Sequence, residues 1–172
     1  MTWVVPAPAE VDGPMVGDDR PMLEAYLAWQ RSVLLNICAG LTAEQLVLAP
    51  LASSNLTLLG LIRHLTKVER TWLRIRVAGE EVAPVFDPAL GKDYDFEHLD
   101  PAEAEQWVAR LQEEWALGDA AVGELFFETT GLNRDGEPMS LRMVYVHMIG
   151  EYARHNGHAD LLREAIDGET AR

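Results

Sequence analysis

Residues 141–166 read LRMVYVHMIGEYARHNGHADLLREAI, and this stretch decides the fold class because its apolar residues recur with the period of an α-helix. One stripe of that helix contains Leu141, Val144, Met148, Tyr152, Ala159, Leu162 and Ile166. Ser140 precedes the stretch as an N-cap, and Gly168 follows it as a stop signal. The stretch therefore predicts a long helix that buries one face against other helices.

Three further segments show the same helical period and the same kinds of end signal. They span residues 19–39, 56–78 and 100–123. Together with the last helix they predict an all-α fold, a four-helix bundle. Long loops are expected between the second and third helices and between the third and fourth, and the latter loop has room for a short hairpin or an extended crossover.

The predicted domain organisation is simple. Residues 1–18 carry several Pro and Gly and no helical period, so they are expected to form an N-terminal arm that packs on the domain or stays mobile. Residues 19–172 are expected to form one domain, since a chain of 172 residues with 48% hydrophobic residues can build one core. The motif LTAEQL at 41–46 predicts a capping box between Thr42 and Gln45.

Composition excludes several classes of function. The chain has 28 acidic and 14 basic residues and a net charge of −14, which repels nucleic acid and anionic membrane surfaces. The single cysteine, Cys38, forms no intrachain disulfide and lies in an apolar run, where a thiol behaves as a small buried hydrophobe. We expect a cytoplasmic protein with a small-molecule substrate, no nucleic-acid partner and no membrane partner.

The last helix presents polar residues at turn spacing along its buried side. His155 lies within the apolar stripe, and Glu151 lies on its shoulder. His158 lies farther out on the same side, and His147 is the farthest. The geometry of the helix therefore ranks Glu151 and His155 first among the groups that can meet a ligand in the core.

The second helix offers a matching histidine. His64 falls on the shoulder between the buried face of this helix and a basic face that we expect to be solvated. The basic face consists of Arg63, Lys67, Arg70 and Arg74. Glu69 projects toward the core, where a carboxylate needs a cation or hydrogen-bond donors, so we expect it to pair with an arginine or to orient a ligand without binding metal itself.

If His64 meets Glu151 and His155, two imidazoles and one carboxylate form a site for a divalent ion that leaves a position open for water or substrate. From spacing alone a structural alternative stays open, in which Glu151 pairs with Arg154 and His155 is a core histidine. His147 is expected at the surface or an interface. His98 and the acidic run 93–97 are expected to be solvated, since that run lacks a calcium-loop spacing.

Two segments resemble a known family. LTLLGLIRHLTKVERTWL, followed far downstream by HMIGEYARHNGHADLLREAIDG, resembles the DinB/YfiT-like superfamily over about residues 20–168. Within it, the chain is more similar to the branch near the metal-binding domain of mycothiol-dependent maleylpyruvate isomerase. The resemblance implies a four-helix bundle in up-down-down-up order, and a homodimer, since members are often dimeric.

The resemblance also implies a ligand set. The family's helix-two histidine corresponds to His64, and its two last-helix ligands correspond to Glu151 and His155. In the family's His-Arg-Gly-Gln run the leading His binds metal, so His158 takes the place of the Gln, outside the ligand set, where it can orient a ligand or contact substrate. The implied cofactor is a divalent metal, zinc or, alternatively, nickel.

Characterised relatives use low-molecular-weight thiols such as mycothiol or bacillithiol. The resemblance therefore implies a metal-dependent S-transferase or isomerase with such a thiol as cosubstrate. Two other hypotheses stay open from the sequence: a non-catalytic bundle that binds metal or a small ligand, and a metal-dependent hydrolase in which water replaces the thiol. Metal-dependent turnover distinguishes an enzyme from the non-catalytic bundle, and activity without added thiol identifies the hydrolase.

Overall fold

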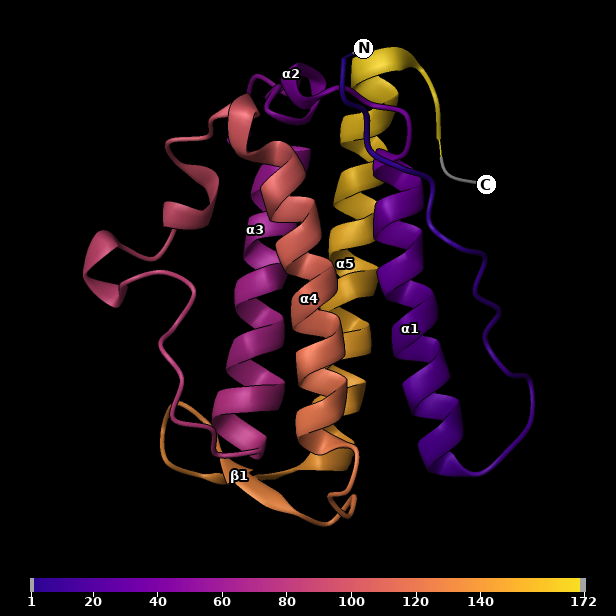
Figure 1. Cartoon of the computed structure of the whole chain (residues 1–172), viewed down its shortest axis with the longest axis vertical. Coiled ribbons are helices and arrows are strands. Elements are labelled where there is room, and N and C mark those ends of the chain that lie inside the picture. Colours follow the sequence, from indigo (N-terminus) through magenta and orange to yellow (C-terminus); the bar gives the residue numbers. More distant parts are fainter. Residues whose placement is uncertain (1, 171–172) are drawn as a thin grey trace.

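The computed structural model describes residues 2–170 and is mostly helical, as predicted. Its long helical segments are α1 (Asp19–Cys38), α3 (Leu58–Glu69) with its continuation η1 (Arg70–Val77), α4 (Ala104–Val122) and α5 (Leu141–Asp167). They lie side by side, with α1 and α5 pointing one way and α3 and α4 the other (Figure 1). Because α1 packs on α5 and α3 packs on both α4 and α5, the core lies between these four segments.

Several helix ends follow the predicted signals. The Ser140 hydroxyl accepts a hydrogen bond from the third amide of α5, and Gly168 ends this helix at a φ of 82°, a left-handed conformation that favours glycine. The short helix α2 (Ala43–Leu46) begins with the predicted capping box, because the side chains of Thr42 and Gln45 each accept from the other's main-chain amide.

The second predicted helix is not a uniform α-helix. Thr57 caps α3, but from Arg70 to Val77 the main chain adopts the wider π-helical hydrogen bonding, and the amide of Ala78 donates to the carbonyl of Leu73 at 3.0 Å. Neither Gly nor Pro lies between residues 61 and 78 to signal a change. The expectation of a single α-helix over 56–78 is therefore corrected to an α-helix followed by a π-helical segment.

A short sheet departs from the all-α prediction. Strands β1 (Thr130–Leu132) and β2 (Pro138–Ser140) pair antiparallel in the loop between α4 and α5. Asn133 closes the turn, since its side-chain oxygen accepts from the amides of two later turn residues, and Gly136 there has a φ of 80°. The hairpin that the sequence left as an alternative is the arrangement observed.

The main chain of this hairpin contacts the main chain at the end of η1. A Cβ added to Gly131 would collide with the main-chain carbonyl of Arg76. Glycine is therefore required for the close approach of β1 to η1. Since β2 ends at Ser140 and α5 begins at the next residue, the same contact also places the start of α5 beside the end of η1.

The N-terminal arm packs on the domain at its start. Val5 is buried, and its amide and carbonyl bond the main chain of Leu41 and Gly40 at 3.0 and 2.9 Å. No helix within residues 2–170 is long and apolar enough to cross a membrane.

A closed polar cluster, the Glu69 cluster, lies in the core between the helices. The Arg31 guanidinium binds both carboxylate oxygens of Glu69 at 2.8 Å. The Tyr152 hydroxyl donates to Glu69 at 2.8 Å and accepts from the Trp115 indole at 2.7 Å. Glu69 is fully buried, so these bonds offset the cost of burying its charge. Pairing with an arginine is thus the alternative that the structure shows for Glu69.

The predicted solvated basic face of α3 is largely covered. Arg63 is 4% exposed beneath the loop after η1 and donates to the carbonyls of Tyr94 and Glu97. Arg70 and Arg74 both bind the buried carboxylate of Glu114 on α4. That expectation was wrong because the loop and α4 supply hydrogen-bond acceptors for these arginines. The periodicity of one helix does not show where such acceptors lie.

Candidate metal centre

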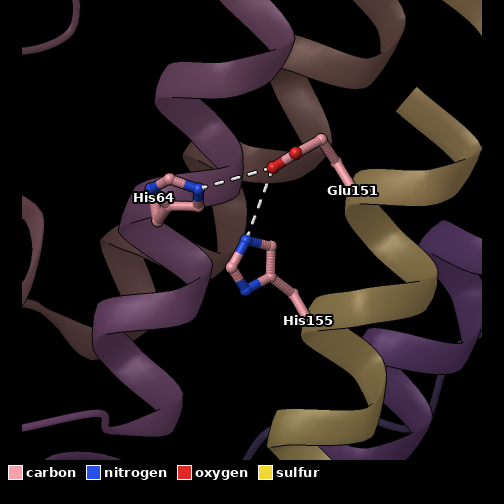
Figure 2. Close-up of side chains that lie close together, drawn as sticks. All are labelled: His64, Glu151 and His155. Carbon is pink, nitrogen blue, oxygen red and sulfur yellow. Dashed lines mark ion pairs between the residues drawn. The ribbon is translucent and has the colours of Figure 1, made fainter. Parts of the chain in front are cut away.

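Three side chains from two helices converge between α3 and α5. His64 projects from α3, while Glu151 and His155, one turn apart, project from α5 toward it (Figure 2). The nearer Glu151 oxygen, Oε2, lies 3.5 Å from His155 Nε2 and 3.9 Å from His64 Nε2. One ligand atom from each residue lies within 4.8 Å of the other two.

These distances suit a shared ion better than direct hydrogen bonds. Separations of 3.5 and 3.9 Å are too long for good hydrogen bonds. Two ligand atoms about 2.1 Å from a tetrahedral zinc ion lie about 3.4 Å apart. His64 Nε2 is also buried without a hydrogen-bond partner among residues 2–170, a state that costs about 1–3 kcal/mol if nothing else binds it. The donor set therefore fits a divalent metal ion.

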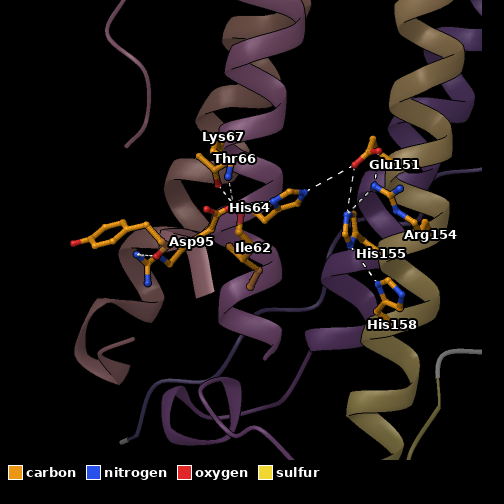
Figure 3. A network of polar contacts seen from close by, with 11 residues as sticks. Ile62, His64, Thr66, Lys67, Asp95, Glu151, Arg154, His155 and His158 are labelled. Carbon is orange, nitrogen blue, oxygen red and sulfur yellow. Dashed lines mark hydrogen bonds and ion pairs between the residues drawn. The ribbon is translucent and has the colours of Figure 1, made fainter. Parts of the chain in front are cut away.

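The other ring nitrogen of His64 is held by a carboxylate. His64 Nδ1 lies 2.8 Å from Asp95 Oδ2, and Asp95 also pairs with the Lys67 ammonium (Figure 3). Burial alone would raise the pKa of Asp95, but the hydrogen bonds from His64 and Lys67 lower it overall. A charged Asp95 keeps the proton on Nδ1 and directs the Nε2 lone pair toward Glu151.

Asp95 is the site residue that the sequence analysis missed. It belongs to the run 93–97, which we expected to be solvated, yet it is 1% exposed. It lies in the 3₁₀ turn η3 (Tyr94–Phe96), and the Phe96 ring stacks on His64 with the ring centroids 5.7 Å apart. The alternation of aromatic and acidic residues in this run was the available signal that it packs on the domain.

His155 has a neutral imidazole suited to metal binding. Burial, followed by the charges of His64 and Arg154, lowers its pKa to about 4. Its Nδ1 lies 3.4 Å from Nδ1 of His158, which therefore contacts a candidate ligand without belonging to the converging set. Arg154 donates to the Oε1 oxygen of Glu151 and leaves Oε2 facing both histidines (Figure 3).

The remaining histidines and Glu69 lie apart from the converging set. His147 packs its ring on Trp72, with centroids 3.9 Å apart, and His98 is exposed, as expected. Glu69 is occupied by Arg31 and Tyr152 in the Glu69 cluster.

One known protein family matches most of the chain. The family model described as Mycothiol-S-transferase matches residues 22–168. The chain belongs to this family. The mycothiol-S-transferase match spans the three residues of the candidate metal centre, and the family is DinB/YfiT-like, in agreement with the resemblance of the sequence. Neither the search of curated proteins nor the search of solved structures found a match.

The single cysteine of this mycothiol-S-transferase family member is poorly suited to be the reacting thiol. Cys38 is fully buried in the core, and burial raises its thiol pKa to about 12. A thiol with so high a pKa is almost wholly protonated at neutral pH and is a poor nucleophile. The family name accordingly points to a separate small-molecule thiol as the sulfur donor.

Proposed function

We propose that this protein is a metal-dependent, cytoplasmic S-transferase of the DinB-like four-helix-bundle type that uses mycothiol or a similar low-molecular-weight thiol. One observation carries the metal dependence: His64 Nε2 is buried without a hydrogen-bond partner and faces Glu151 and His155 at metal-ligand spacing. The family membership supports the thiol as cosubstrate. A homodimer, as in related proteins, is part of the proposal and is checked by sedimentation velocity.

In this proposal His64, Glu151 and His155 bind the ion, zinc in the first instance and nickel as the alternative. Two nitrogens and one carboxylate oxygen suit both metals and leave a further position open. A divalent ion in such a site lowers the pKa of a bound thiol so that the thiolate is available at neutral pH.

The surrounding residues orient these ligands. Asp95 accepts from His64 Nδ1 and fixes the tautomer whose Nε2 faces the site. Arg154 holds one oxygen of Glu151, so the other oxygen keeps its direction toward the histidines. His158, which lies beside His155 Nδ1, is placed to orient that ring or to contact substrate.

The first experiment is elemental analysis of protein purified without chelator. Wild type should carry one equivalent of zinc or nickel, and Glu151→Ala and His155→Ala should lose it. Matched controls are Glu164→Ala on the exposed side of α5 and His98→Ala in the loop, which should keep the metal. A wild type that stays metal-free after supplementation would refute the metal centre.

The second experiment tests the reaction class. Metal-loaded protein is incubated with a panel of electrophiles and mycothiol, bacillithiol or no thiol. Turnover that requires both thiol and metal, and that is absent in Glu151→Ala, supports the S-transferase. Turnover of a substrate without added thiol would indicate the hydrolase instead, and no turnover with any thiol would leave a metal-binding module.

A further inference from the structure

A cavity of about 580 Å³ lies beside the metal centre, between α3 with η1 and the loop that follows η1. Its volume is in the range of sites for small organic molecules. Its wall includes Asp95, which bonds His64, and Trp72, whose ring contacts His147 one turn before Glu151. The cavity therefore shares two neighbouring residues with the candidate metal centre, although none of the three candidate ligands belongs to the described lining.

The cavity wall is positively charged in a strongly acidic protein. It contains Arg76, Lys92 and Arg134, none of which makes an ion pair within residues 2–170, and Lys67, which is paired to Asp95. Asp87 is the other lining carboxylate, and one of its oxygens accepts from the amide of Ala89. Because the chain carries twice as many acidic as basic residues, three unpaired cations around one cavity call for an explanation.

Two of these cations are held close to each other by the main chain. Arg134 lies in the turn between β1 and β2, and Gly131 of that hairpin contacts the main chain at Arg76. Burial, followed by the nearby charge of Arg134, lowers the pKa of Arg76. The fold thus maintains a repulsion between two guanidinium groups, which an anion bound between them would relieve.

The apolar part of the wall suits a flat organic body. The Arg76 guanidinium lies 4.3 Å from the centroid of the Trp72 ring, so it is oriented by a cation–π contact rather than by a carboxylate. Val68 and Phe86 add further apolar surface to the cavity. The combination of aromatic wall and unpaired guanidinium groups is typical of sites for aromatic or other flat carboxylates.

We propose that this cavity binds a small organic anion with a carboxylate group and a flat apolar body, and that the second substrate of the enzyme belongs to this class. Arg76, held over the Trp72 ring, and Arg134 bind the carboxylate, Lys92 adds positive charge at the loop side, and Val68 and Phe86 pack on the apolar body. The assignment of a substrate class rests on the proposed S-transferase function, whereas the binding of the anion is measured independently of it.

The test is a titration of the protein with 4-fluorobenzoate, followed by fluorine NMR, beside the neutral analogue 4-fluorobenzamide. Wild type should bind the benzoate at least about tenfold more tightly than the benzamide, because a hydrogen bond between charged groups contributes more than a neutral one. Arg134→Ala and Arg76→Gln should each weaken benzoate binding by about tenfold or more. Arg134 is exposed in a turn, so its variant should fold even if the Arg76 variant does not.

Two controls make the result specific. Arg110 also lies over a tryptophan, 4.9 Å from the Trp107 ring centroid, but outside the cavity, so Arg110→Gln should leave the affinity unchanged. Glu151→Ala should keep benzoate affinity within about twofold of wild type, because the anion binds the cavity and not the metal. Equal affinity for benzoate and benzamide, an unchanged Arg134→Ala, or loss of binding in Glu151→Ala would each overturn the proposal.

The outcomes also separate this inference from the proposed function. Anion binding without thiol-dependent turnover would refute the S-transferase while leaving the anion site in place. Thiol-dependent turnover without any anion binding would refute only the anion site.

Discussion

Two polar clusters lie in the same core and differ in how completely their atoms are paired. In the Glu69 cluster, each carboxylate oxygen of Glu69 and the Tyr152 hydroxyl have partners at 2.7–2.8 Å. In the candidate metal centre, the distances are 3.5 and 3.9 Å, and His64 Nε2 has no hydrogen bond within residues 2–170. Yet the clusters use neighbouring residues, since Glu151 and Tyr152 are consecutive on α5.

The difference separates stability from ligand binding. Buried polar groups in folded proteins are almost always paired, so a cluster whose bonds are complete needs nothing further. A cluster of polar side chains that lie too far apart to hydrogen-bond to one another, and that leave a buried lone pair, is incomplete without another group. On this criterion the Glu69 cluster stabilises the protein, whereas the candidate metal centre is suited to ligand binding.

The largest expected effect is on the closed cluster. Glu69→Ala leaves the Arg31 guanidinium buried with only Asp119 for a partner and removes the acceptor of Tyr152. The free energy of unfolding should fall by about 3–5 kcal/mol. Urea denaturation followed by circular dichroism measures it, with Glu113→Ala, exposed on α4, as the control.

The matched change in the open cluster should cost less. In chelator-treated protein, His64→Ala loses one hydrogen bond, to Asp95, and should lower the free energy of unfolding by about 1–2 kcal/mol. A loss as large as that of Glu69→Ala would mean that the metal-centre residues are as important for stability as the closed cluster, and the distinction would not hold.

An effect of similar size, on metal affinity rather than on stability, is expected from the carboxylate behind His64. Asp95→Asn keeps the shape of the side chain but removes its charge, so the His64 tautomer is less firmly held. Zinc affinity should fall by about 10–100-fold, measured by competition with a chromophoric chelator. Asp93→Asn, exposed two residues earlier in the same loop, should keep wild-type affinity. Unchanged affinity in Asp95→Asn would show that Asp95 does not act on the site.

The smallest effect concerns a second closed cluster, around Glu114. Burial raises the pKa of Glu114, but the hydrogen bonds and charges of Arg70 and Arg74 lower it overall. A carboxylate whose pKa is lower in the folded state stabilises above its unfolded pKa, about 4.3, and loses that contribution as pH falls through the folded value.

Wild type should therefore lose more stability than Glu114→Gln between pH 7 and pH 3, measured by urea denaturation at several pH values. Glu113→Gln, the exposed neighbour, should follow the wild-type profile. Identical slopes for wild type and Glu114→Gln would contradict the assigned pKa direction.

The sequence predicted the features that depend on one helix at a time. The stripe of 141–166 placed Glu151 and His155 on the inner side of α5, and the caps at Ser140 and Gly168 fixed its ends. His64 was found because it lies at the shoulder of an equally periodic helix. The convergence of the three residues depends on the packing of α3 on α5. This packing cannot be derived from the periodicity of either helix alone.

Two of the missed features depend on contacts between distant segments. Asp95 is buried because aromatic neighbours fix η3 on α3, and Arg70 and Arg74 are covered because Glu114 of α4 faces them. An acidic run or a basic face read by itself indicates exposure. The π-helical turn of η1 escaped for another reason, since the residues in it are ordinary helix formers.

The contact of Gly131 with Arg76 has a consequence for the alignment of His64 and Glu151 in the candidate metal centre. α3 and α5 are separated in the chain by the long loop and α4, so nothing in their direct connection sets how far one helix slides along the other. The hairpin fixes the starting points of the two helices relative to each other. Twelve residues of α- and π-helix lead from Arg76 back to His64, and eleven residues, roughly 16 Å of α-helix, lead from Ser140 on to Glu151. A slip of one helical turn, about 5.4 Å, would move Glu151 out of reach of His64. The two lengths nearly match, so the close contact at Gly131 places His64 and Glu151 at the same level along their two helices.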